Sequence, residues 1–125
     1  MVENGRAKAA FEFCNKHKGT KVFKSYRSKV RDMPTRIQVN GYAGAVAFLF
    51  SNIDDGDKGY QLLYEDIQSW LKEQELISDD KESSLMKQIV SVDKQQYRQI
   101  TAETMALLGW MKRFADGFHI KGDKG

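Results

Sequence analysis

Cys14 and His17 are two residues whose types could carry nucleophilic catalysis, in which a base takes the proton of a neighbouring thiol. They lie three positions apart at the end of a predicted helix that runs from Asn4 to about Lys16. Cys14 falls on the apolar side of that helix, and no neighbouring residue would orient His17. We therefore interpret Cys14 as a small buried residue of the core.

Arg113 and His119 lie six positions apart near the end of the last predicted helix. This pair resembles the motif of HEPN-type helical ribonucleases, which work without a metal ion. The sequence departs from that motif at Phe114, where the family usually has a polar residue, and at Gly117, which disturbs the helix between the pair. A metal-independent helical ribonuclease using Arg113 and His119 is therefore kept as the alternative function.

The sequence contains no recognisable motif for a cofactor or a metal ion. There is no P-loop, no dinucleotide fingerprint and no cysteine–histidine cluster for zinc. Residues 52–59 invite comparison with a calcium-binding EF-hand loop, which requires glycine at its sixth position. Glycine falls at the fifth position instead, whether the loop begins at Asn52 or at Asp55. We predict a solvated acidic loop, no metal, no cofactor and no catalytic residue.

Charge is distributed unevenly along the 125 residues. Residues 1–36 hold ten Lys/Arg and three Asp/Glu, a balance of +7. Residues 37–82 hold three and ten, a balance of −7, and residues 83–125 hold seven and four, a balance of +3. This pattern favours a polyanionic partner, a self-association partner of opposite charge, or both. Chance clustering of surface charge is the alternative.

Apolar residues spaced by three and four predict the helices. The predicted segments are Asn4 to about Lys16, Thr20 to about Asp32, Pro34 to Phe50, Tyr60 to Leu76, Leu85 to Val90, and Tyr97 to Phe118. The last segment is the longest, with Asp93 as its cap and Gly117 or Gly122 at its end, and we expect the core to form around it. Trp110 lies off its main apolar line, which predicts burial over a wide arc.

Residues 37–42, Ile-Gln-Val-Asn-Gly-Tyr, are ambiguous because they also fit a hairpin with an Asn-Gly turn. No other convincing strand exists to extend it, and a lone hairpin is only marginally stable. We therefore predict one long helix across Gly41. The predicted class is all-α, a single compact bundle of five to six helices over residues 1–118 with a frayed tail over residues 119–125.

Length and composition suggest where such a protein works. A chain of this size forms one domain with its own core, and a single cysteine fits a reducing compartment. No apolar run approaches the ~20 residues that a membrane span needs. The first residues lack the apolar stretch of a signal peptide. We expect a soluble cytoplasmic protein without a membrane partner.

Several short stretches in this order resemble one family. They are Arg6-Ala7, Met33-Pro34 with Ile37, Asn40-Gly41-Tyr42, Ala47-Phe48-Leu49, Trp70-Leu71, Tyr97, Glu103, Ala106-Leu107-Leu108 and Trp110 to Ala115. Together they are similar to the small all-helical subunit of type III-B (Cmr-type) CRISPR effector complexes, over nearly the whole chain. Met33 and Tyr42 replace leucines that are usual there, and both keep an apolar group.

The resemblance implies a non-catalytic subunit of an RNA-guided complex that binds and destroys foreign RNA. In that family several copies stack along the filament of guide RNA paired with target RNA, and cutting belongs to other subunits. The implied partners are guide RNA, target RNA, the other subunits and copies of itself. The shared motifs are mostly core and helix-packing positions, so they carry over a fold rather than a binding site.

The RNA-facing residues are predicted from charge geometry alone. A guide–target duplex is recognised mainly through its phosphates and its shape, which requires Lys and Arg on a rigid face. The solvent side of the second predicted helix is nearly all cationic. The predicted contacts with the RNA backbone are Lys21, Lys24, Arg27, Lys29 and Arg31, with Arg36, Arg6 and Lys8 adjoining them.

Overall fold

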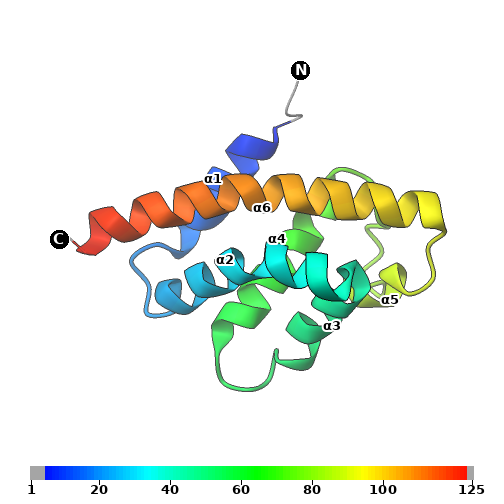
Figure 1. Ribbon diagram of the computed structural model, residues 1–125, viewed down its shortest axis with the longest axis horizontal. Coiled ribbons are helices and arrows are strands. Elements are labelled where there is room, and N and C mark those ends of the chain that lie inside the picture. The colour runs from blue at the N-terminus through cyan, green and yellow to red at the C-terminus, as the bar shows by residue number, and fades with distance from the viewer. Residues whose placement is uncertain (1–4, 124–125) are drawn as a thin grey trace.

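A computed structural model describes the backbone of residues 5–123 and the side chains of residues 5–119. Over this range the chain forms six helices and no strand, which confirms the predicted all-α class (Figure 1). The helices are α1 (Arg6–His17), α2 (Phe23–Asn40), α3 (Tyr42–Ser51), α4 (Lys58–Glu73), α5 (Leu85–Ile89) and α6 (Lys94–Asp123).

Helix α6 spans the molecule, and both α1 and α2 pack along it (Figure 1). Asp93 caps it as predicted, accepting a hydrogen bond of 2.8 Å from the Gln96 backbone N–H. Its buried side chains follow the predicted spacing: Ile100, Thr104, Leu107, Leu108, Met111 and Ala115. Trp110 is only partly buried and stacks on Phe114, with ring centroids 5.9 Å apart.

The last helix ends beside Gly122, one of the two glycines predicted for its end, and not at Gly117. Helix α6 continues through it and reaches Asp123, so the predicted tail of residues 119–125 begins as helix. An interior glycine costs a helix about 1 kcal/mol relative to alanine. Phe114 and Phe118 pack against the core on either side of Gly117, and this packing holds the backbone helical. Residues 124–125 lie outside the described part, as does the predicted first cap, Asn4.

Pro34 does not begin a new helix either, because α2 runs through it. Proline removes one helical N–H group and usually costs an interior position ~3 kcal/mol. Here Met33 and Ile37 are 1% and 5% exposed and anchor the helix to the core on both sides of the proline. Tertiary packing thus outweighs the local preference that predicted a boundary near Asp32.

The chain breaks instead at Gly41, where φ is 81°, a value that favours glycine. The Gly41 N–H donates to the Ile37 carbonyl at 2.8 Å, and the Gly41 carbonyl accepts from the Ala45 N–H at 3.0 Å. Gly41 therefore closes α2 and opens α3. The prediction of one helix across this point was wrong, and the Asn-Gly pair joins two helices without forming a hairpin.

Candidate nucleic-acid interface

Helix α2 carries cations on both sides of its buried stripe, which includes Tyr26 and Val30. Arg27 and Arg31 lie on the side toward α6, where both contact one carboxylate. Lys29 and Arg36 lie on the other side, toward α3 and α4. The predicted cationic face is therefore divided into two flanks.

Arg27 and Arg31 share the carboxylate of Asp116 on α6. The Arg27 Nε and Arg31 Nη1 atoms each lie 3.0 Å from the same oxygen, Asp116 Oδ1. Burial alone would raise the pKa of Asp116, but hydrogen bonds and attraction from the two guanidinium groups outweigh it and lower the pKa. Asp116 is therefore ionised at neutral pH, and the three groups together carry a net charge of +1.

Lys29 is held on the opposite flank by an acidic cap. Its Nζ lies 3.2 Å from Asp57 Oδ2 and 4.4 Å from the centre of the Tyr60 ring. Asp57 also caps α4 by accepting from the Gly59 N–H at 3.0 Å, and it accepts a hydrogen bond from the Ser25 hydroxyl. The Ser25 hydrogen bond is the largest of the influences that lower the pKa of Asp57.

Arg36 is stacked and paired. Its guanidinium carbon lies 3.6 Å from the centre of the Phe48 ring, and its Nη2 donates to Asp32 Oδ2 at 2.8 Å. Lys21, Lys24 and Lys8 differ from it because each is exposed and forms no ion pair within the described residues. The positive charge of these three lysines is therefore not offset by a paired carboxylate of the described residues.

Arg6 lies in a joint between three helices. Its Nε and Nη2 atoms donate to the two oxygens of Glu103 on α6 at 2.8 and 2.9 Å. The indole N–H of Trp70 on α4 donates to the same carboxylate at 2.8 Å. Arg6, Trp70 and Glu103 all belong to the stretches that resemble a family, so the structure explains those motif positions by helix packing.

The structure does not bring Arg113 and His119 together for catalysis. The Arg113 guanidinium lies 5.3 Å from the Trp110 ring. On a continuous helix, side chains six positions apart point about 120° away from each other and lie about 9 Å apart along the axis. Residues 113 and 119 are both within α6, so this geometry gives no support to a ribonuclease site.

Cys14 is a buried thiol, as predicted. Burial, with a contribution from the nearby charge of Asp66, raises its pKa to about 12, so it is protonated at neutral pH. Its Sγ donates to the Met111 carbonyl at 3.4 Å. His17 Nε2 lies 3.0 Å from Asp66 Oδ2, which also accepts from the Tyr26 hydroxyl at 2.7 Å. Both residues take part in core packing.

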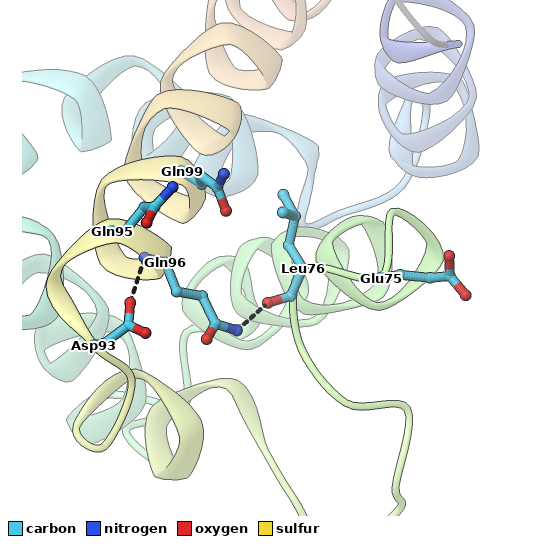
Figure 2. A pocket seen from close by; sticks show the side chains of 6 residues that line it. All are labelled: Glu75, Leu76, Asp93, Gln95, Gln96 and Gln99. Atoms are coloured by element: carbon cyan, nitrogen blue, oxygen red, sulfur yellow. Dashed lines mark hydrogen bonds between the residues drawn. The ribbon is translucent and has the colours of Figure 1, made fainter.

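Several surface hollows are lined by carboxylates and amides, and they lie near the start of α6, far from Arg27 and Arg31. Figure 2 shows one of them, lined by Glu75, Leu76, Asp93, Gln95, Gln96 and Gln99. In it the Gln96 side chain donates to the Leu76 carbonyl at 2.9 Å, and Glu75 points away from the others. Neighbouring hollows add Glu65, Glu73 and Asp79. Carboxylates and amides of this kind do not suit a phosphate.

Two absences among the described residues bear on other types of site. No group of three histidine, cysteine, aspartate or glutamate side chains gathers there to hold a metal ion. None of the helices in that part of the chain has the length and apolar character to cross a bilayer.

Residues 2–118 match the family model described as CRISPR-associated protein (Cas_Cmr5). The chain belongs to the CRISPR-associated Cmr5 family. Membership makes it a small subunit of the type III-B Cmr complex and implies partnership with the other subunits, and the predicted resemblance is confirmed. No curated protein matches the chain.

A crystal structure of a CRISPR-associated Cmr5 family protein from Thermus thermophilus has the same fold. The TM-score is 0.76 at 23% identity, and the alignment covers 94% of this chain and 98% of that chain. The shared fold extends over nearly the whole bundle.

Proposed function

We propose that this Cmr5 family protein contacts the backbone of the guide–target duplex through the flank of α2 that faces α6. We call this surface the basic flank, and it consists of Lys21, Lys24, Arg27 and Arg31. The observation that carries the proposal is the gathering of these cations at the end of the bundle opposite the hollow of Figure 2, with Lys21, Lys24 and Arg31 exposed and Arg27 partly exposed. The setting we propose is the cytoplasm, where guide and target RNA would be met.

The basic flank suits phosphates better than bases. Its cations stand on or beside a helix whose other side is fixed by fully buried residues such as Tyr26 and Val30. Each guanidinium has five N–H donors, so Arg27 and Arg31 keep donors beyond those that contact Asp116. Such a surface recognises the shape and charge of a duplex, while sequence is read by pairing between guide and target.

The other predicted contacts take different places in this proposal. Lys29 and Arg36 face the second flank and are already paired, and Lys8 lies on α1, so we propose them as peripheral contacts. We leave Arg6 out, because the Nε–Nη2 edge of its guanidinium group is engaged with Glu103 and its side chain is only 20% exposed.

We further propose that copies of the protein stack along the filament in head-to-tail order, which requires two different surfaces on each copy. The acidic end supplies one of these surfaces, and a basic edge of the neighbouring copy outside the basic flank supplies the other. The exposed carboxylates of the acidic end are Glu73, Glu75, Asp79, Asp80 and Glu82. In this arrangement the subunit positions RNA and takes no part in its chemistry.

The test is charge reversal of Lys24, Arg27 and Arg31 to Glu in the assembled complex. The slope of log affinity for target RNA against log salt should fall in magnitude by about 2–3, since each lost phosphate contact contributes about 0.7–0.9. The order of preference among target sequences should not change. An unchanged slope would place the RNA on another face.

The matched control reverses three exposed lysines that lie off the basic flank, Lys81, Lys87 and Lys94. It changes the net charge by the same amount and should alter the slope much less. Thermal melting of both triple variants, together with a version carrying Gln at the three flank positions, separates loss of binding from loss of folding.

A further inference from the structure

The basic flank contains an anion of its own. Asp116 accepts from Arg27 and from Arg31 through a single oxygen, at 3.0 Å in each case. The two arginines lie four positions apart on α2, so their side chains are neighbours on the helix surface. A carboxylate bridging two guanidinium groups occupies the kind of position that an RNA phosphate would take.

We infer that Asp116 is a built-in counter-anion that weakens the hold of the basic flank on RNA. The inference rests on the proposed function and adds a residue that regulates the same surface. Asp116 is the only carboxylate that forms an ion pair with the flank among the described residues. Helix α2 has a single acidic residue of its own, Asp32, and it pairs with Arg36 on the other side of the helix.

The sign of the effect follows from charge. With Asp116 ionised, the cluster of two arginines and one carboxylate presents one net positive charge to a phosphate. Without the Asp116 charge, the same two arginines present two positive charges. The position of α2 does not depend on Asp116, because its buried stripe already fixes the helix to the core. Loss of the negative charge therefore strengthens binding more than loss of orientation weakens it.

A weakened flank has a use in a repeating complex. A copy that binds a duplex poorly by itself binds well when several copies engage the same duplex at once, because each later contact is made at high effective concentration. Asp116 thus keeps the free subunit away from unrelated RNA and reserves binding for the assembled filament. Its role is one of specificity.

The experiment compares the isolated full chain with its Asp116→Asn variant, using a 20-base-pair RNA duplex of arbitrary sequence as probe and fluorescence anisotropy between 50 and 200 mM salt. One additional phosphate contact corresponds to a slope steeper by ~0.7–0.9, and hence to ~5–8-fold tighter binding at 0.1 M salt. Asp54→Asn makes the same change in net charge at an exposed position between α3 and α4 that belongs to neither proposed surface, and it should leave affinity within ~2-fold.

Further variants test whether the gain acts through the arginines. Adding Arg27→Gln and Arg31→Gln to Asp116→Asn should abolish it. Asp116→Ser replaces Asp116→Asn if the latter fails to fold by circular dichroism. Equal affinity of the Asp116 and Asp54 variants, or weaker binding by a folded Asp116 variant, would overturn the inference.

The two proposals fail in different ways. If the charge-reversed triple variant binds RNA normally within the complex, the basic flank itself is wrong. If that variant binds poorly while Asp116→Asn shows no gain, the flank stands and only the role of Asp116 is lost.

Discussion

Replacing Glu103 by Gln should destabilise the protein strongly, because this carboxylate joins three helices. It accepts two hydrogen bonds from Arg6 on α1 and one from Trp70 on α4, all between 2.8 and 2.9 Å. The Arg6 and Glu103 side chains are only 20% and 11% exposed. A glutamine keeps the shape, but it loses the charge and turns an amide N–H₂ toward groups that also donate.

The expected loss of unfolding free energy lies between the values for a fully buried ion pair and for an exposed one. Removing one partner of a fully buried ion pair costs about 3–5 kcal/mol, whereas an exposed pair contributes about 0.2–1 kcal/mol. Because the Arg6–Glu103 pair is mostly buried but still partly hydrated, we expect Glu103→Gln to lower the free energy of unfolding by about 2–4 kcal/mol. With an m-value of about 2 kcal/mol/M in urea, the midpoint falls by about 1–2 M.

Urea unfolding followed by circular dichroism measures this shift. Arg6→Met, Glu103→Gln and the double variant complete a cycle that isolates the coupling between the two residues. Asp32→Asn is the control, since it breaks an exposed i,i+4 pair with Arg36 and should cost about 0.5 kcal/mol or less. If Glu103→Gln costs no more than this control, the joint is an ordinary surface contact and Arg6 is available to RNA after all.

Three further outcomes are expected. Trp70→Ala should cost about 3–5 kcal/mol in unfolding free energy and Trp110→Ala clearly less, because Trp70 is 1% exposed and Trp110 only partly buried; equal losses in urea titrations would contradict this burial. The lowered pKa of Asp57 stabilises the fold above the ordinary aspartate pKa of about 3.9, and this contribution is lost as pH falls through the lower folded value. Melting of Asp57→Asn and wild type should therefore converge in acid, and a constant gap down to pH 2 would count against it. Purified protein and its His119→Ala variant should both leave single-stranded RNA intact, with or without divalent ions, and cleavage that disappears in the variant would restore the ribonuclease alternative.

The sequence predicted the helices best where the signal is local. The apolar spacing of α6 and the Asp93 cap depend on residues within a few turns, and both match the structure. The helix boundaries at Pro34 and Gly41 were predicted wrongly for the same reason. Local residue preferences indicate where a helix could end, but contacts with the core decide at which of these positions it does end. Met33 and Ile37 carry α2 past the proline.

The candidate site was predictable in its cations and unpredictable in their partners. Charge alone indicated Arg27 and Arg31, but the carboxylate that they share lies 89 and 85 positions away in the sequence. Arg6 shows the same limit, because its partner Glu103 is 97 positions distant. Pairing over such separations depends on how α1 and α2 dock on α6, which no local pattern specifies.

The buried thiol of Cys14 offers a way to measure local opening of this protein. It is the only cysteine in the chain, it is held against the Met111 carbonyl between α1 and α6, and its pKa of about 12 leaves almost no thiolate at neutral pH. The thiolate is the nucleophile that attacks a thiol reagent, so labelling must wait until α1 moves away and the thiol becomes accessible and can ionise. The rate of labelling therefore reports how often α1 separates from α6, and it can be measured without introducing another cysteine.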